Sequence, residues 1–148
     1  MKTEFVGVAP LLQVYDMPTA VRFYRDLLGF EILNQSRDGE EFDWCLLSRG
    51  GTEIMLNTMY ESEYRPSRPD EKRTAAHSDI GWYFACRELD SAYEHLRASG
   101  VRVEPPRVAT YGMRQLSFRD PDGYGICFQW PANKHWAEQW RSRYGFEV

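Results

Sequence analysis

The side chains with the clearest chemical potential in this sequence are carboxylates and aromatic rings that gather in the same regions. The acidic residues lie in one short segment and just after it: Asp38, Glu40, Glu41, Asp43, Glu53 and Glu61. Aromatic residues follow in the same region and later in the chain: Trp44, Tyr60, Trp82, Tyr83 and Tyr111. Carboxylates attract cations, and each contact with a ring face contributes about 0.5–2 kcal/mol. The pattern is suited to holding a flat cation, although a run such as DGEEFD is more often a solvated turn and Trp44 could equally be core.

Residues that make nucleophiles or metal ligands are few and widely separated: Cys45, Cys86, Cys127, His77, His95 and His135. Cys127 would be a nucleophile only with a histidine beside it, and the sequence places none there. A buried, inert thiol is therefore the favoured interpretation. An odd number of cysteines without metal-type clustering favours reduced thiols, and we expect a cytoplasmic protein.

Charge and hydropathy exclude two classes of partner. The 148 residues carry a formal net charge of −4, and the isoelectric point is about 5.4. A protein that follows a phosphate backbone normally has a basic surface, so we expect no nucleic-acid partner. No apolar run approaches the roughly 20 residues that span a membrane, and MKTEFVGV lacks the core of a signal peptide, so we expect no membrane association.

Apolar spacing predicts the elements that must position these side chains. Residues 5–15 are expected to form a strand buried on both faces. Asp16 is expected to cap a helix that Gly29 ends. The strands expected next are 30–33, 42–48 and 53–57, the last two joined by a tight turn at 49–52. The polar segment 60–77 is predicted to be a long connection without regular structure.

The same order of elements then repeats. The expected elements are a strand at 80–86, a helix from Glu88 or Asp90 to Ser99-Gly100, and strands at 101–104, 114–118 and 125–130 around the DPDG turn. Met17, Ala20, Val21 and Tyr24 recur 72 positions later as Leu89, Ala92, Tyr93 and Leu96. An internal repeat of this length indicates two equal units. One face of each sheet should carry its helix, and the other should meet the partner sheet or line a cavity.

The sequence therefore predicts one α+β domain built from two tandem βαβββ modules, about 4–60 and 79–131. A linker at about 61–78 should join them, and a helix at about 133–144 should follow. That helix carries Trp136, Trp140 and Tyr144 on one side. Such an aromatic ridge favours docking to the body of the protein or to a second subunit.

Two segments carry a family resemblance, VAPLLQVYDMPTAVRFYRDLLGFEIL at 8–33 and DPDGYGICFQW at 120–130. They resemble the two ends of a vicinal oxygen chelate domain, the superfamily of glyoxalase I, the bleomycin-resistance proteins and the extradiol dioxygenases. The resemblance covers about 5–130 and implies paired modules with pseudo-twofold symmetry around a U-shaped groove. It also implies a homodimer, because Pro10 lies close to the place where bleomycin-resistance proteins exchange an N-terminal strand.

Metal-dependent members of this superfamily hold a divalent ion with His or Glu from the first and fourth strand of each module. The resemblance places these positions at Ala9, Met55, Gly81 and Cys127, none of which is a histidine or a carboxylate. The neighbouring positions on the same faces are Leu11, Gln13, Glu53, Asn57, Tyr83 and Gln129. We therefore expect no metal and no cofactor, with recruitment of His77 and Glu53 as the alternative.

The favoured function is a metal-independent binding protein of the bleomycin-resistance type, which sequesters an antibiotic or an aromatic cationic metabolite in an acidic, aromatic groove. The predicted ligand-binding residues are Gln13, Trp44, Glu53, Met55, Tyr83, Tyr111, Cys127 and Gln129, and no catalytic residue is predicted. One alternative is a metal-dependent lyase, isomerase or dioxygenase with non-standard ligands. Another is a regulatory domain without a small ligand, whose final helix docks a protein.

Overall fold

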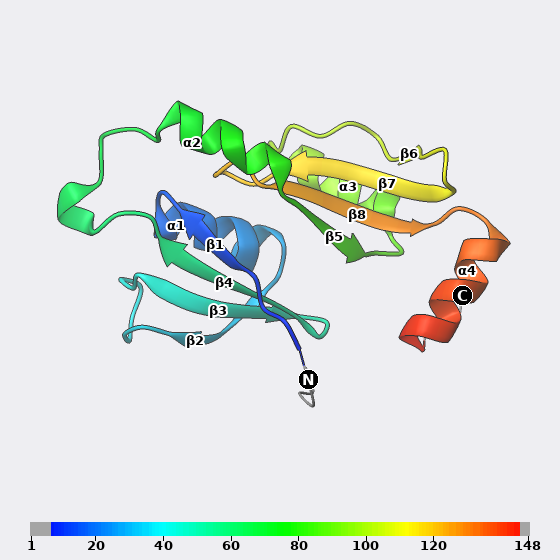
Figure 1. Cartoon of the computed structure of the whole chain (residues 1–148), viewed down its shortest axis with the longest axis horizontal. Helices are drawn as coiled ribbons and strands as arrows, with labels where there is room; N and C mark the ends of the chain where they lie inside the picture. The colour runs from blue at the N-terminus through cyan, green and yellow to red at the C-terminus, as the bar shows by residue number, and fades with distance from the viewer. Residues whose placement is uncertain (1–6, 146–148) are drawn as a thin grey trace, which may run out of the picture. The chain divides into compact units, whose positions relative to one another are not determined.

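The computed structural model describes residues 7–145, without the side chains of Ser62 and Tyr144. The chain divides into two units, Met1–Thr74 and Ala75–Val148. The first unit is built from β1 (Leu11–Val14), α1 (Met17–Val21), η1 (Arg22–Leu27), β2 (Glu31–Gln35), β3 (Trp44–Arg49) and β4 (Thr52–Thr58). The second is built from β5 (Gly81–Ala85), α3 (Leu89–Ala98), β6 (Arg107–Val108), β7 (Met113–Arg119), β8 (Gly125–Pro131) and α4 (Lys134–Tyr144) (Figure 1).

Each unit contains one four-stranded mixed sheet, and the two sheets have the same connectivity. The strand order is β1-β4-β3-β2 in the first unit and β5-β8-β7-β6 in the second. In both, the first strand runs parallel to the fourth and the other neighbours are antiparallel. The predicted α+β class and the repeated βαβββ order are therefore confirmed.

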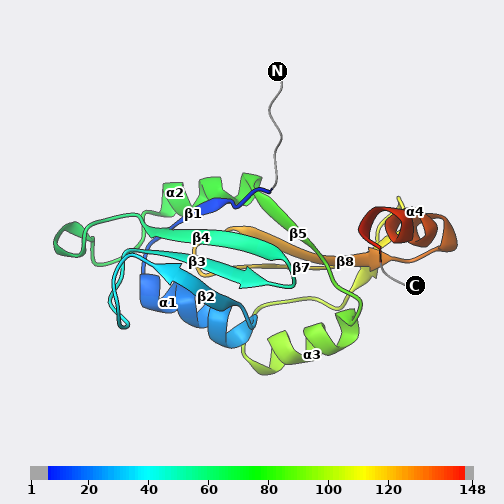
Figure 2. The same cartoon turned by 90° about the horizontal axis from the view of Figure 1, so that it is seen from below.

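One face of each sheet is closed by the helix of the same unit, as Figure 2 shows for α1 and α3. On the first sheet the closed face consists of Leu12, Val14, Cys45, Leu47, Ile54 and Leu56, each at most 1% exposed. On the second it includes Leu116, Phe118 and Ile126, which are buried together with Leu89 and Leu96 of α3. Because apolar burial is the main stabilising term in folding, these faces hold each unit together.

The first helix starts as predicted, since the Asp16 carboxylate accepts hydrogen bonds from the backbone N–H of Thr19 at 3.1 Å and its hydroxyl at 2.5 Å. It continues as a π-helix, η1, in which the N–H of Leu28 donates to the carbonyl of Phe23. The wider turn was not predicted, because one extra residue hardly alters the apolar stripe. Gly29 ends the helix with φ 72°, a left-handed conformation that glycine adopts without strain.

The prediction of a first strand buried on both faces was wrong. The strand covers only Leu11–Val14, and Leu11 is 47% exposed. The strand lies at the edge of its sheet and has one closed and one open face. Phe5 and Val6, which the prediction included, lie outside the described residues.

The prediction of a strand at 101–104 was also wrong, because pairing with β7 begins later, at Arg107. Pro105 and Pro106 separate the two places. A proline has no backbone N–H to donate to a ladder, and it restricts the residue before it. The ladder with β7 can therefore form only after the two prolines.

The connection between the modules is more ordered than the sequence indicated. It contains η2 (Ser62–Tyr64), α2 (Glu71–Ala76) and η3 (His77–Asp79). The carboxylate of Asp70 accepts hydrogen bonds from the backbone N–H groups of Lys72 and Arg73, which begins α2. None of the residues of α2 is buried, so the helix has no apolar stripe by which periodicity could reveal it.

The final helix, α4, docks on its own unit. The Asn133 side chain caps it by accepting a hydrogen bond from the N–H of Trp136 at 3.0 Å. The ring of Trp140 packs edge-on against Trp130 of β8 at 5.6 Å between centroids. Gly112, with φ 88°, lies so close to the Asn133 and Trp136 side chains that a Cβ there would overlap them. Docking to the body is thus observed for Trp140, whereas the Tyr144 side chain lies outside the described part.

Candidate functional site

The face of each sheet that carries no helix of its own unit holds most of the predicted binding residues. Alternation along the strands assigns side chains to it. In the first unit it consists of the odd-numbered positions of β1 and β4 and the even-numbered positions of β3, here called the first open face. In the second unit it consists of the odd-numbered positions of β5, β6, β7 and β8, called the second open face.

The first open face brings together Gln13, Trp44, Glu53 and Met55, four of the predicted residues. Trp44 and Met55 are half-buried, and Glu53 is exposed. Trp44 lies directly opposite Asn57, whose Nδ2 donates to Oε1 of Gln13 at 3.2 Å. An indole, a thioether, a pair of amides and a carboxylate therefore share one surface of the sheet.

The charge of this face is negative. Glu31 at the start of β2 pairs directly with Ser48, so its side chain points to the same side as Ser48. Glu31 and Glu53 are exposed carboxylates, and none of the described strand positions on this face carries a basic side chain. The face can therefore attract a cation, because no basic side chain among these described strand positions neutralises its carboxylates.

The second open face holds Tyr83, Cys127 and Gln129, three more of the predicted residues. Tyr83 is 63% exposed, whereas Cys127 is buried directly opposite it in the register. Gln129 accepts a hydrogen bond at Oε1 from Nε2 of Gln115, at 3.0 Å. Tyr111 does not belong to this face, because it lies in the turn before β7 with 53% exposure.

Gln115 is a residue that the sequence reasoning missed. It lies directly opposite Gln129 across the β7–β8 hairpin. The DPDG turn could have revealed it, since the turn fixes the register of the hairpin and therefore the partner of every residue on it. The turn is built by the buried Asp120, whose Oδ1 accepts hydrogen bonds from the N–H groups of Asp122 and Tyr124.

The thiol of Cys127 is poorly suited to nucleophilic chemistry. Burial raises its pKa above the ordinary value, against weaker opposing hydrogen bonds that involve Ser117 and Leu116. Burial likewise raises the pKa of Cys45, on the closed face, to about 11. Since the thiolate is the reactive form, both groups favour the interpretation as inert thiols.

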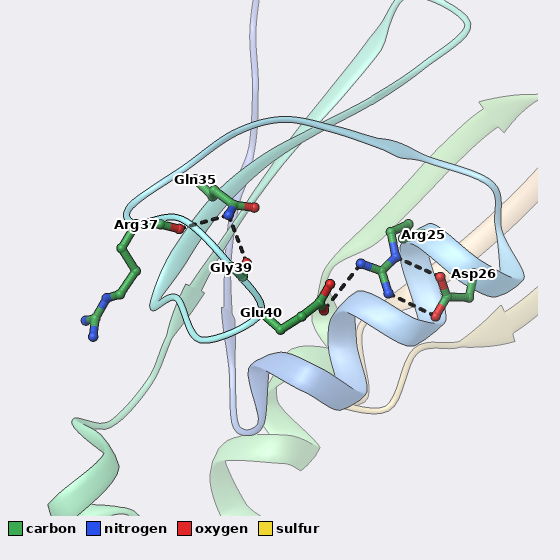
Figure 3. Close-up of polar contacts among 6 residues, drawn as sticks. All are labelled: Arg25, Asp26, Gln35, Arg37, Gly39 and Glu40. Carbon is green, nitrogen blue, oxygen red and sulfur yellow. Dashed lines mark hydrogen bonds and ion pairs between the residues drawn. The ribbon is translucent and has the colours of Figure 1, made fainter.

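The acidic loop between β2 and β3 is partly neutralised by arginines. The guanidinium of Arg25 lies between Asp26, at 2.7 Å, and Glu40, at 3.6 Å (Figure 3). Arg37 forms an ion pair with Asp43. Only part of the negative charge that the sequence showed here is therefore available to a ligand.

The same loop is held in a defined shape by one amide. Nε2 of Gln35 donates to the backbone carbonyls of Arg37 at 2.8 Å and Gly39 at 3.0 Å, as Figure 3 shows. Asp38 and Glu41 are exposed and form no ion pair within residues 7–145. The loop thus combines a folded turn with two solvated carboxylates.

His77, the alternative metal ligand, has a packing role. Its side chain is 8% exposed, and its ring stacks on Tyr124 with 4.1 Å between centroids and 6° between planes. Nδ1 lies 2.6 Å from the backbone carbonyl of Asp122, so Nδ1 carries the proton and donates it. The ring therefore fastens the end of the connection to the turn before β8.

The residues at the metal positions of a vicinal oxygen chelate domain do not fit a divalent ion. Ala9 and Gly81 offer no donor, Met55 offers a thioether, and Cys127 a buried thiol. Hard and borderline ions need imidazole nitrogen or carboxylate oxygen at several of these places. Within residues 7–145, moreover, no three His, Cys, Asp or Glu side chains are grouped so that they could hold a metal.

None of the helices in residues 7–145 is long and apolar enough to cross a membrane. Among curated proteins, none matches the chain. Solved structures do match it. A bleomycin resistance determinant encoded on the transposon Tn5 superposes with a TM-score of 0.63 at 20% identity, covering 87% of this chain and 100% of its own.

Two other structural matches have different names. A virulence protein from Salmonella typhimurium has a TM-score of 0.60 at 24% identity and covers 86% of this chain and 98% of its own. A lactoylglutathione lyase from Agrobacterium tumefaciens has a TM-score of 0.61 at 17% identity, with 85% and 94% covered. At such identities these matches establish the fold alone. A family model does match residues 7–128, and the chain therefore belongs to the Glyoxalase/Bleomycin resistance protein/Dioxygenase superfamily.

Proposed function

We propose that the protein binds a small aromatic, cationic molecule, such as an antibiotic, and sequesters it without a metal ion. The observation that carries the proposal is the composition of the first open face. A half-buried indole, Trp44, shares that face with the carboxylates of Glu31 and Glu53, and none of the strand positions described on this face is basic. Such a surface favours a flat cation through ring contacts and charge together.

The register arranges these groups in rows across the sheet. Trp44 lies opposite Asn57, Leu46 lies opposite Met55, and Ser48 lies opposite Glu53. A ligand lying along β3 and β4 would meet the ring and amide first, then an apolar row, then the carboxylate. With about 3.3 Å per residue, the indole and the Glu53 row are roughly 13 Å apart along the strand. The proposed ligand therefore carries its cation about that far from its flat ring.

Sequestration needs only stoichiometric binding and therefore requires no catalytic group. The donor set at the family's metal positions does not suit a divalent ion, which supports binding that is independent of metal. The likeness to a bleomycin resistance determinant supports an antibiotic as the occupant. That likeness is one of fold.

The test is a tryptophan fluorescence titration of the full chain with metal-free bleomycin, in buffer with and without EDTA. We expect saturable binding that EDTA leaves unchanged. Trp44→Ala should weaken it about tenfold, because it removes a ring contact worth about 1–2 kcal/mol. Glu53→Gln should weaken it a few-fold, and this difference should shrink in high salt.

Glu71→Gln is the matched control, since it removes an exposed carboxylate from α2, outside the first open face. It should leave the binding constant unchanged. If metal-free bleomycin does not bind, or if Trp44→Ala binds it as tightly as the wild type, the proposal is wrong for this class of ligand.

A further inference from the structure

The second open face carries a donor and acceptor pattern that the aromatic-cation proposal does not use. Gln115 and Gln129 are half-buried, and one hydrogen bond joins them, from Nε2 of Gln115 to Oε1 of Gln129. Each side-chain amide has two N–H donors and a carbonyl with two lone pairs. Within residues 7–145, that bond leaves the Nε2 group of Gln129 and the carbonyl of Gln115 without another partner.

These two groups are complementary hydrogen-bonding atoms on side chains that face each other across the hairpin. Gln129 offers N–H, and directly across the hairpin Gln115 offers C=O. The matching partner is a group whose C=O and N–H lie side by side on one edge. A ring amide, as in a lactam or cyclic imide, has that edge, whereas an ordinary trans peptide points its C=O and N–H in opposite directions.

A cation lies next in the same row. Arg107 of β6 is directly opposite Gln115, so its side chain lies on the same side of the sheet. It is exposed and forms no ion pair with any of the described residues. A guanidinium beside two amides is suited to a carboxylate, which it can bind through two parallel hydrogen bonds.

The other side of the amide pair is open. Ala85 lies directly beside Gln129 on the edge strand and has only a methyl group. The ring of Tyr83 folds back over Gly81, where a Cβ would lie 3.2 Å from Cε2 of that ring. The row across the sheet therefore consists of a methyl group, an N–H donor, a C=O acceptor and a guanidinium, from Ala85, Gln129, Gln115 and Arg107 in that order. Neighbouring strands are about 4.8 Å apart.

The geometry points to a binding site on the second open face for a cyclic amide that bears a carboxylate next to its N–H. The ligand C=O accepts from Nε2 of Gln129, its N–H donates to Oε1 of Gln115, and its carboxylate binds Arg107. The order of the three groups in the ligand matches the order of the three side chains. No carboxylate stands among the described strand positions of this face, and Arg119 adds a second exposed positive charge.

The test uses orotate, whose ring N–H lies between a carbonyl and the ring carbon that carries its carboxylate. Binding to the full chain is followed by calorimetry and by the NMR signals of the Gln side-chain amides. Uracil has the same edge without the carboxylate, so orotate should bind at least about tenfold more tightly, the effect of one charged hydrogen-bonded contact. Arg107→Ala should remove this preference, so that orotate and uracil bind this variant alike.

Arg102→Ala is the matched control, because Arg102 is an exposed arginine of the same unit that lies outside the sheet. It should keep the preference for orotate. Gln115→Leu should weaken the binding of both orotate and uracil, with its fold checked by circular dichroism. Arg107→Ala keeps the test decisive even if Gln115→Leu fails to fold, because the Arg107 side chain is exposed and forms no ion pair with the residues that the structure describes.

Absence of orotate binding, or an unchanged preference for orotate in Arg107→Ala, would overturn the inference. A protein that binds orotate in this pattern and ignores bleomycin would refute the proposed function alone, and the reverse result would refute this site alone.

Discussion

The two open faces have the same strand order and opposite charge. Glu31 and Glu53 lie on the first, whereas Arg107 and Arg119 lie on the second. The closed faces, in contrast, are built in both units mainly from buried apolar side chains. The repeat therefore preserves what packs under the helix and varies what faces away from it. The closed faces determine the fold, and the open faces are where the two units differ in chemistry.

The amide pairs show the same divergence at one position. Asn57 and Gln129 occupy matching places on the fourth strands, 72 residues apart. Asn57 bonds Gln13 on the edge strand, whereas Gln129 bonds Gln115 on the hairpin partner. The amide bond thus lies on opposite sides of the fourth strand in the two units. In the first unit the amide pair lies beside the indole of Trp44, which is opposite Asn57. In the second unit it lies beside Arg107, which is opposite Gln115.

The largest expected effect comes from the contrast between closed and open faces, tested within a single strand. Leu47 of β3 is fully buried on the closed face, and its neighbour Leu46 is half-buried on the first open face. Leu47→Ala should lower the free energy of unfolding by about 2–5 kcal/mol, through lost burial and a cavity. Leu46→Ala should cost less than about 1.5 kcal/mol. Urea denaturation of both variants measures the difference.

The two leucines are chemically identical neighbours, so the comparison isolates the face. Equal losses from Leu46→Ala and Leu47→Ala would mean that the open face is packed as firmly as the closed one. The proposed sites on the open faces would then lack the accessible surface they require.

The fold could be predicted because its causes are local and periodic. Asp16 and Gly29 mark the ends of the first helix, and the 72-residue offset reveals the second module. The failures have equally local causes. The two prolines before Arg107 displaced one strand, and α2 has no apolar side for a pattern to show. The edge strand β1 buries only one of its two faces, although its run of apolar residues suggested burial of both.

The candidate site could be predicted only as far as strand alternation reaches. Gln13, Met55 and Gln129 were assigned to the correct strands because their places within the module are fixed. Gln115 and Arg107 were missed, since each is identified only by the residue across the ladder. Cross-strand partners depend on register, which the DPDG turn fixes for Gln115. For Arg107 the register could not be used, because the strand before the hairpin was predicted at 101–104 and pairing begins only at Arg107. The charge contrast between the faces was invisible for the same reason.

A smaller effect is expected at the starts of the two matching helices. Asp16 caps α1 with its carboxylate, whereas Glu88 at the start of α3 makes no side-chain capping hydrogen bond. Asp16→Ala should therefore lower the free energy of unfolding by about 1 kcal/mol. Glu88→Ala should change it by less than about 0.5 kcal/mol. Thermal melts of both variants at pH 7 measure this, and equal losses would refute the difference between the two caps.

The smallest expected effect concerns the charge of that cap. Burial alone would raise the pKa of Asp16, but hydrogen bonds from Thr19 and the adjacent Arg65 outweigh it and hold the pKa below its ordinary value. A carboxyl whose pKa is lower in the folded state stabilises the fold above its unfolded pKa, about 3.9, and that contribution is lost as pH falls through the folded value. Asp16→Asn keeps a capping oxygen and removes the charge, so it should be less stable than the wild type at pH 6.

That deficit should shrink steadily below about pH 4, as the wild-type carboxyl takes up its proton. Urea denaturation of both proteins at several pH values measures it. In an Arg65→Ala background the deficit at pH 6 should be smaller, because the partner of the charge is gone. A deficit that stays constant down to pH 3 would show that the carboxylate acts only as a hydrogen-bond acceptor. The first helix would then differ from the second by its cap geometry, with no contribution from charge.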